Sequence, residues 1–392
     1  MKKKILFVVD EFFPISTAGA ARMNSFLKEC AKTYDVALLC GREQESSTDN
    51  IPEVTYYCLQ RPNEKSKFAP FIFAWYFLRF NQKLVQLSRN FNLVYVSIPR
   101  YEFLYGITRL KKKNISYILD IRDLLESKNY ELIFQRFLPT FAARSFAKIL
   151  EKQNKRMLKK AIGDSVLTTV AYKGLYTLYT QTFPQFKEKI KYIPNGVDLD
   201  YFPKIQKKNS TEKLQLLYIG NFAEKDYLIP IIKELGKFQG KEKLEIIFVG
   251  DGRKKQDIER LVKEQGLGQQ TRFLGKKHHK EIYTLAEKAD IGIILRDPEL
   301  PTLLPVSVVE YMALSLPVIV NDYSELGEFV RETNAGYIIK EPSELNQLLF
   351  ALLTKQKELE NIGKINRRWI EENGSRGIIA KKFREEIVEK SL

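Results

Sequence analysis

The chain has 392 residues, of which 44% are hydrophobic, and it carries a formal net charge of +16. This length predicts two domains of roughly 100–200 residues each. No run of about 18 apolar residues occurs, which argues against a membrane-spanning helix. The positive charge points to an anionic partner, such as nucleic acid, anionic lipid or a phosphate-rich substrate.

The N-terminus is basic and then apolar, as in a signal peptide. However, the apolar run over residues 5–9 is short, and Asp10 and Glu11 stand where a small-residue cleavage site would lie. We therefore interpret this segment as a buried first strand. Three cysteines without metal-ligand spacing indicate reduced core thiols of a cytosolic protein. They are Cys30, Cys40 and Cys58.

Short apolar runs alternate with helical patterns along the chain, which predicts right-handed βαβ units and parallel sheets. In the first half the predicted strands cover residues 5–9, 36–39, 54–59, 93–96, 117–120, 165–169 and 190–193. In the second half they cover residues 214–219, 244–249, 272–274, 291–295, 318–320 and 337–339. The pattern restarts after a polar stretch between Asp198 and Lys213. We therefore predict a Rossmann-like domain over residues 1–203, a second over 204–368, and a helical tail over 369–392 that packs back toward the first domain.

Ligands of doubly wound domains bind at the carboxyl ends of the strands, so the residues that follow the first-domain strands are informative. The loop after the first strand contains Ala18 and Gly19 and opens a helix. Glycine allows close approach of a ligand and a helix N-terminus favours an anion, although an ordinary strand-to-helix turn has the same pattern. Arg122 and Asp123 belong to a charged group after the strand 117–120, which either faces a site or pairs internally.

Two glycine-containing loops follow strands of the second domain. Gly220 and Asn221 are followed by Lys225, a cation suited to stabilise a leaving diphosphate, although a plain surface lysine is the alternative. Gly250 and Gly252 form a tight loop after the next strand. Both loops are therefore expected at the crevice where ligands of such domains bind.

A single carboxylate, Glu310, lies in a small apolar helix that leads to the strand 318–320. A buried acid needs polar partners, and the hydroxyls of a ribose would supply them. A capping or salt-bridged glutamate is the alternative. The residues that open this helix, Pro305, Val306 and Ser307, offer a helix N-terminus to an anion.

The segments 193–198, 120–127 and 307–313 together resemble the retaining glycosyltransferases of family 4. That family has the GT-B fold, an α/β architecture of two Rossmann-like doubly wound domains facing each other across a cleft. The segment 120–127 is similar to the acidic motif of members that build capsule, O-antigen and exopolysaccharide units. The resemblance implies that Lys225 binds the donor diphosphate, that Glu310 binds the donor ribose, and that Gly19 lies near the donor phosphates and the acceptor. It also implies that Gly250 and Gly252 approach the nucleotide base.

Several positions depart from the family's pattern. Asn221 stands where an arginine is usual, and Lys225 follows it one residue earlier than the family's lysine. Thr302 stands where the first of two paired glutamates is usual, and Arg122 stands where a histidine often precedes an aspartate. Ala18 replaces the first glycine of a glycine pair. These departures leave the fold prediction unchanged and leave the donor sugar open.

The resemblance implies transfer of a sugar, with retention, from a UDP-linked donor to a lipid-linked or polysaccharide acceptor. It implies front-face attack assisted by the departing phosphate, with no metal or other cofactor, and Asp123 as a residue that could orient the acceptor hydroxyl. The alternatives are a GT-B sugar-nucleotide epimerase or phosphorylase and a non-catalytic GT-B partner subunit. Nucleic acid is not expected as a partner, because the lysines are dispersed and no recognition motif is present.

Basic residues recur at three- and four-residue spacing in one first-domain segment, which places them on one face of a helix. They are Arg144, Lys148, Lys152, Lys155 and Lys159. The aromatic segment 68–78 lies upstream and is flanked by basic residues. We predict that both segments dock on the anionic cytoplasmic face of a membrane, where a lipid-linked acceptor would be found. A solvated helix face and a buried core helix are the alternatives.

Overall fold

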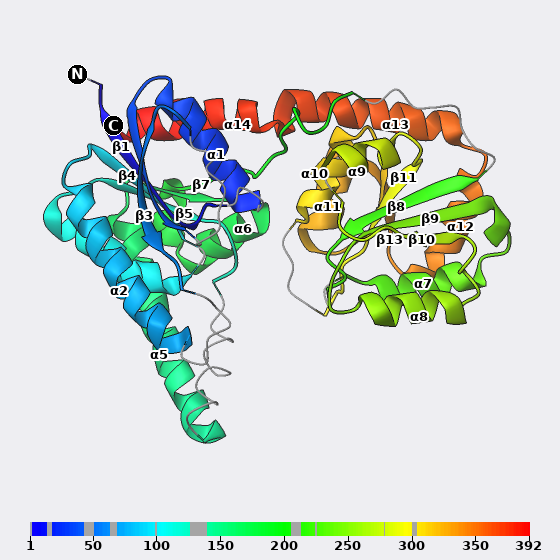
Figure 1. Cartoon of the computed structure of the whole chain (residues 1–392), viewed down its shortest axis with the longest axis horizontal. Helices are drawn as coiled ribbons and strands as arrows, with labels where there is room; N and C mark the ends of the chain where they lie inside the picture. The colour runs from blue at the N-terminus through cyan, green and yellow to red at the C-terminus, as the bar shows by residue number, and fades with distance from the viewer. Residues whose placement is uncertain are drawn as a thin grey trace. The chain divides into compact units, whose positions relative to one another are not determined.

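The computed structural model describes residues 2–13, 18–42, 51–62, 69–98, 100–125, 139–204, 213–223, 226–277, 279–299 and 304–392. The chain forms two compact units (Figure 1). Unit 1 comprises Met1–Asn195 and Ile379–Leu392, and unit 2 comprises Gly196–Ile378. Each unit has one parallel sheet with helices between most successive strands, which confirms the predicted α/β class of two Rossmann-like doubly wound units.

The sheet of unit 1 has the strand order β3-β2-β1-β4-β5-β6-β7. Its strands are β1 (Lys4–Glu11), β2 (Asp35–Arg42), β3 (Val54–Gln60), β4 (Leu93–Ile98), β5 (Tyr117–Ile121), β6 (Leu167–Val170) and β7 (Ile190–Tyr192). Its helices are α1 (Ala18–Ala31), α2 (Ala69–Ser88), α3 (Leu104–Leu110), α5 (Thr140–Asp164) and α6 (Lys173–Thr182). The N-terminal segment is a buried strand, as predicted.

The sheet of unit 2 has the order β10-β9-β8-β11-β12-β13. Its strands are β8 (Leu214–Gly220), β9 (Leu244–Gly250), β10 (Thr271–Phe273), β11 (Ile291–Ile294), β12 (Val318–Asn321) and β13 (Gly336–Ile339). Its helices are α7 (Leu228–Lys237), α8 (Lys255–Glu264), α9 (His279–Ala286), α10 (Val306–Ala313), α11 (Ser324–Thr333), α12 (Leu345–Leu352) and α13 (Gln356–Trp369). Each predicted strand of both halves is present, because strands that are covered on both faces have continuous apolar sequences.

The chain passes between the units at two places that lie close together. Val197 is fully buried in unit 2; its N–H donates to the carbonyl of Gly374 (2.9 Å), and its carbonyl accepts from the N–H of Arg376 (2.8 Å). Phe202 is also buried in the core of unit 2. The structure therefore assigns residues 196–203 to unit 2, whereas the sequence suggests a boundary after residue 203. The tail expected over residues 369–392 belongs to both units. Its first part, up to Ile378, lies in unit 2, and the part from Ile379 onward lies in unit 1, so the boundary falls within α14 (Arg376–Phe383).

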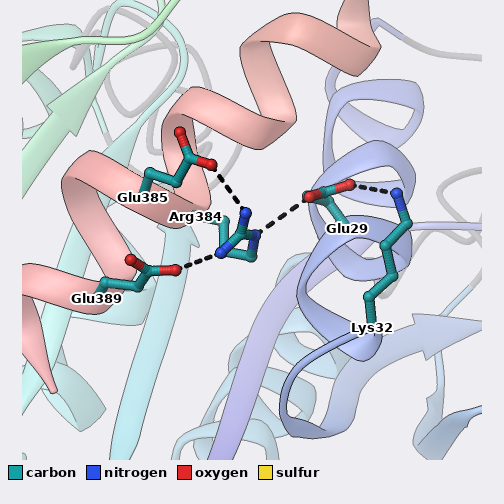
Figure 2. A network of polar contacts seen from close by, with 5 residues as sticks. All are labelled: Glu29, Lys32, Arg384, Glu385 and Glu389. Carbon is teal, nitrogen blue, oxygen red and sulfur yellow. Dashed lines mark hydrogen bonds and ion pairs between the residues drawn. The ribbon is translucent and has the colours of Figure 1, made fainter.

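The last residues of the chain belong to the core of unit 1. The ring of Phe383 stacks on Phe26 of α1 with a centroid distance of 4.0 Å. Beyond it, π-helical turns over Arg384–Val388 carry the Arg384 guanidinium between three carboxylates (Figure 2). Arg384 pairs with Glu29 of α1 (3.1 Å), with Glu385 (2.9 Å) and with Glu389. This network and the ring stack attach the C-terminal segment to α1.

The three cysteines differ in exposure. Cys30 and Cys40 are buried as expected, but Cys58 is exposed and is therefore not a core thiol. Its Sγ lies 3.5 Å from the Sγ of Cys40, because the two residues are neighbours on β3 and β2. Among the described residues, no helix combines the length and the apolar character needed to cross a membrane.

Asp120 at the end of β5 is a fully buried carboxylate. Its oxygens accept hydrogen bonds from Arg22 of α1 (2.9 and 3.0 Å), Ser97 of β4 (2.7 Å) and Thr169 of β6 (2.7 Å). Arg22 also donates to the carbonyl of Ile193 (2.9 Å). Burial lowers the pKa of the Arg22 guanidinium, but the charge and hydrogen bonds of Asp120, together with Tyr95 and Tyr172, more than offset this, so the pKa lies above its ordinary value. One carboxylate thus connects a helix with three strands.

We expect Asp120→Ala to destabilise unit 1 by about 3–5 kcal/mol, because Arg22 would remain buried without its counter-charge. Urea unfolding followed by circular dichroism measures this loss. Asp123→Ala is the matched control, since Asp123 is an exposed aspartate three residues further on and should cost far less. Equal losses in the two variants would contradict the structural role of Asp120.

Candidate functional site

The carboxyl edge of unit 1 contains several charged side chains, most of which have protein partners. Asp10 at the end of β1 is buried and accepts a hydrogen bond from the hydroxyl of Tyr76 on α2 (2.7 Å). Burial raises the pKa of Asp10, although Arg61 and the Tyr76 hydrogen bond oppose the shift. Asp10, like Asp120, is therefore held within the fold of unit 1.

Arg122 follows β5 and lies against Gly19 in the first turn of α1. A Cβ atom on Gly19 would lie 2.7 Å from Nη1 of Arg122 and 3.3 Å from its Cδ, so the glycine makes room for the guanidinium group. Burial lowers the pKa of Arg122, and the carboxylates of Asp120, Glu11 and Asp10 raise it in opposition. Among the described residues, Arg122 has no hydrogen-bonding or ion-pair partner. The structure thus brings two predicted site residues together and leaves this cation available.

The other predicted site residues of unit 1 are Asp123 and Ala18. Asp123 is exposed, and its Oδ1 accepts a hydrogen bond from the N–H of Leu124 (2.8 Å) within the same turn. Ala18 is the first residue of α1, directly before Gly19. The charged residues around the end of β5 therefore have different surroundings. Asp120 pairs internally, Arg122 packs against Gly19 of α1, and Asp123 is exposed to solvent.

The two glycine-containing loops of unit 2 are packed backbone to backbone. Gly220 ends β8 beside Gly250 at the end of β9. Gly250 has φ +136°, and a Cβ atom there would lie 1.8 Å from the carbonyl oxygen of Gly220. A Cβ atom on Gly252 would lie 1.7 Å from the carbonyl oxygen of Asn221. Any side chain at these positions would force the loops apart, so packing alone requires both glycines.

Lys225 lies outside the described residues, but residues on both sides of it, Phe222 and Asp226, are held by the fold of unit 2. Phe222 is buried with φ +44°. The carboxylate of Asp226 accepts hydrogen bonds from Tyr218 (2.9 Å) and the N–H of Ala223 (3.0 Å), and it pairs with Arg296 after β11. Arg296 was not suggested by the sequence. Burial lowers its pKa, which is consistent with a guanidinium held inside the fold.

Glu310 lies on α10, the helix that precedes β12. The hydroxyl of the next residue, Tyr311, donates to the carbonyl of Leu217 (3.0 Å) and accepts from the N–H of Ile219 (2.6 Å). This double contact fixes α10 against β8, the strand that ends at Gly220. The predicted contact residues Pro305, Val306 and Ser307 open α10, where no side chain caps the helix. Thr302 lies outside the described residues.

The Glu310 carboxylate has no hydrogen bond or ion pair with any described residue. Burial raises its pKa, and the nearby charge of Arg376 opposes the rise. Arg376 itself has a pKa lowered by burial, and its buried Nε donates to no described group. Arg376 was missed by the sequence analysis, because it lies in a helical tail with no local motif. A carboxylate in this setting can accept hydrogen bonds from ligand hydroxyls.

The comparisons with known proteins agree with this architecture. Residues 201–369 match the family model "Glycosyl transferases group 1". The search of curated proteins gives no match.

Three solved structures illustrate the similarity of fold. HepE from Anabaena, in complex with UDP and glucose, is 14% identical, with a TM-score of 0.68 over 98% of this chain and 99% of that chain. Sucrose-phosphate synthase from Thermosynechococcus elongatus is 14% identical, with a TM-score of 0.74 over 99% of both chains. WaaG, a glycosyltransferase involved in lipopolysaccharide biosynthesis, is 13% identical, with a TM-score of 0.65 over 97% of this chain and 99% of that chain. The chain thus has the two-domain GT-B fold of glycosyltransferases, and residues 201–369 match the glycosyl transferases group 1.

Proposed function

We propose that the protein transfers a sugar from a nucleoside diphosphate sugar to an acceptor hydroxyl, in the manner of the retaining family 4 enzymes. The observation that supports this most is the Glu310 carboxylate, which is partly buried, has a pKa raised by burial, and has no partner among the described residues. A ribose supplies two adjacent hydroxyls as donors to such a group. UDP is the favoured nucleotide, since similar structures such as HepE contain it.

In this proposal unit 2 binds the donor. The backbone of the loops at Gly220 and Gly250 approaches the nucleotide, and Glu310 accepts hydrogen bonds from its ribose. Lys225 and the uncapped N-terminus of α10 stabilise the negative charge that develops on the departing diphosphate. Asn221 offers an uncharged amide at the position where the family usually has a cation.

Unit 1 binds the acceptor, with Arg122 as its available cation and Asp123 as a group that orients the hydroxyl. The acceptor oxygen bonds to the anomeric carbon as the bond from that carbon to the phosphate oxygen breaks. The hydroxyl proton passes to the departing diphosphate, on the same face, so the configuration is retained. Neither a metal nor another cofactor is needed. A lipid-linked or polysaccharide acceptor is supported by the similarity to WaaG.

The test of this function is a thermal-shift screen of nucleoside diphosphates and their sugars, followed by product analysis. We expect UDP or a UDP-sugar to stabilise the protein, by about 2.7 kcal/mol at a hundredfold excess over Kd. We also expect transfer to persist in a metal chelator. Isomerised free nucleotide sugar would instead identify an epimerase, and absence of nucleotide binding would identify a non-catalytic subunit.

Glu310→Gln should change stability and binding in opposite directions. A raised carboxyl pKa means that the folded state favours the protonated form, so stability falls as pH rises through that pKa. The glutamine removes this fall and should stabilise unit 2 at neutral pH, on the order of 1 kcal/mol. UDP binding should weaken, because the ribose loses an ionised acceptor. Calorimetry measures both effects; the exposed Glu328→Gln is the control, and unchanged UDP affinity in Glu310→Gln would remove Glu310 from the site.

Lys225→Ala should lower turnover by at least about tenfold, because a preorganised cation on a leaving group contributes roughly 2–4 kcal/mol to the transition state. Steady-state kinetics with the donor found in the screen gives kcat and KM separately. The control is Lys263→Ala, which removes an exposed lysine of α8 in the same unit. If kcat is the same in both variants, Lys225 does not act on the diphosphate.

A further inference from the structure

The long helix α5 of unit 1 has one buried and one strongly basic face. Its buried face is formed mainly by small and aliphatic residues, among them Ala143, Ala147 and Leu158. Its exposed basic residues are Arg144, Lys148, Lys152, Lys155, Arg156, Lys159 and Lys160. Lys155 pairs with Glu151 (2.8 Å) and Lys160 with Asp164 (3.1 Å).

Most of this positive charge has no counter-charge in the part of the chain that the structure describes. Lys148, Lys152, Arg156 and Lys159 form no ion pair with any described carboxylate. Five basic side chains between Lys148 and Lys159, together with Glu151 and Phe183, line an open groove of about 400 Å³. A concave surface of this charge favours phosphate groups over neutral ligands.

Large apolar side chains are exposed on α5 and on two helices beside it. α3 packs against both α2 and α5. Half of the large hydrophobic side chains that are exposed in the described structure lie on these three helices. They are Ile72, Trp75 and Leu78 on α2, Tyr105 on α3, and Phe141, Phe146 and Ile149 on α5. Such a concentration is typical of an interaction surface rather than of scattered surface residues.

These exposed side chains lie in the N-terminal halves of their helices. Helices that connect parallel strands run antiparallel to them, so their N-terminal ends lie at the carboxyl edge of the sheet, the edge that contains Gly19 and Arg122. Figure 1 shows α5 extending well beyond the strands of unit 1. Further along α2, the exposed residues Gln82 and Gln86 are polar. The apolar surface is therefore confined to the end of unit 1 where an acceptor would bind.

Trp75 is the most characteristic member of this surface. Its side chain is 59% exposed, and the guanidinium carbon of Arg79 lies 4.6 Å from its ring centroid. An exposed tryptophan covered by a cation suits the headgroup region of a bilayer, where one side of the ring meets lipid and the other meets phosphate. The inner face of α2 differs, because Tyr76, Phe77 and Phe80 are buried in unit 1.

We infer that the N-terminal ends of α2 and α3, together with the exposed face of α5 from Phe141 to Lys159, form a docking surface for an anionic bilayer. The cations of α5 bind lipid phosphates, and Trp75, Leu78 and Phe141 insert at the interface. This inference goes beyond the proposed transfer reaction and does not depend on it. Docking in this orientation holds the carboxyl edge of unit 1 close to the lipid, so a lipid-linked acceptor reaches Arg122 without leaving the anionic cytoplasmic leaflet.

The test is sedimentation of the full chain with vesicles of phosphatidylcholine, with or without phosphatidylglycerol. We expect binding only with the anionic lipid, and weaker binding at high salt. Changing Lys148, Lys152 and Lys159 together to glutamate should weaken binding by about a hundredfold. The matched control changes Lys111, Lys112 and Lys113 to glutamate. These three lysines are exposed in the same unit at the opposite end of α3, and the net charge changes by the same amount.

A second readout follows the insertion of Trp75 directly. The chain has two tryptophans, Trp75 and Trp369. In a Trp369→Phe variant, anionic vesicles should shift the Trp75 emission to the blue, and brominated lipid should quench it. Trp75→Ser should reduce binding at high salt as well as at low salt, because its contribution does not depend on charge.

Three outcomes would overturn the inference. The first is equal loss of binding in the α5 variant and the Lys111–Lys113 control, which would indicate an effect of net charge alone. The second is binding without any change in Trp75 emission. The third is absence of binding to anionic vesicles, in which case α5 is a solvated face or contacts a protein.

Discussion

The buried charge of Asp120 is the constraint on which the acceptor side of the molecule depends. A carboxylate at the centre of a sheet must be fully hydrogen-bonded, and here Arg22, Ser97 and Thr169 supply the donors. Because Arg22 belongs to α1, the ion pair fixes the first turns of that helix above the end of β5. The same arrangement brings Gly19 beneath Arg122. The ion pair between Arg22 and Asp120 thus determines the position of α1 against which Arg122 packs. Asp120 itself is too enclosed to act on a substrate.

In unit 2, close packing rather than a buried ion pair holds the candidate site residues in position. The loops after β8 and β9 contact each other through glycine backbones, and the Tyr311 hydroxyl fixes α10 to β8 by two hydrogen bonds. Glu310 precedes Tyr311 on this fixed helix, and its partial burial disfavours the charged carboxylate, which lowers the stability of the fold at neutral pH. Residues that destabilise a fold in this way are expected at binding sites, because a ligand supplies the missing hydrogen bonds.

The sequence predicts the strands well, because a parallel sheet covered on both faces requires continuous apolar runs such as Ile246–Val249. It also identifies the loops that meet at the carboxyl edges. It does not predict which charged residues pair, since Arg22 and Asp120 are distant in the chain and the acidic segment 120–127 does not indicate that Arg22 is the partner of Asp120. The boundary at Asn195 is missed for a similar reason. Only tertiary packing reveals that Val197 and Phe202 are buried in unit 2.

Arg376 shows how such long-range pairing affects the candidate site. The backbone of Val197 pairs with Gly374 and Arg376, which joins the two places where the chain passes between the units. Asp198 follows Val197, so the same pairing brings its charge into the field of the Arg376 guanidinium, together with that of Glu310. The electrostatic environment of Glu310 therefore includes Arg376, whose own charge also interacts with Asp198 at the other crossing. A shift of the backbone at either crossing would change the charge balance around this carboxylate, and with it the fraction of Glu310 that is ionised.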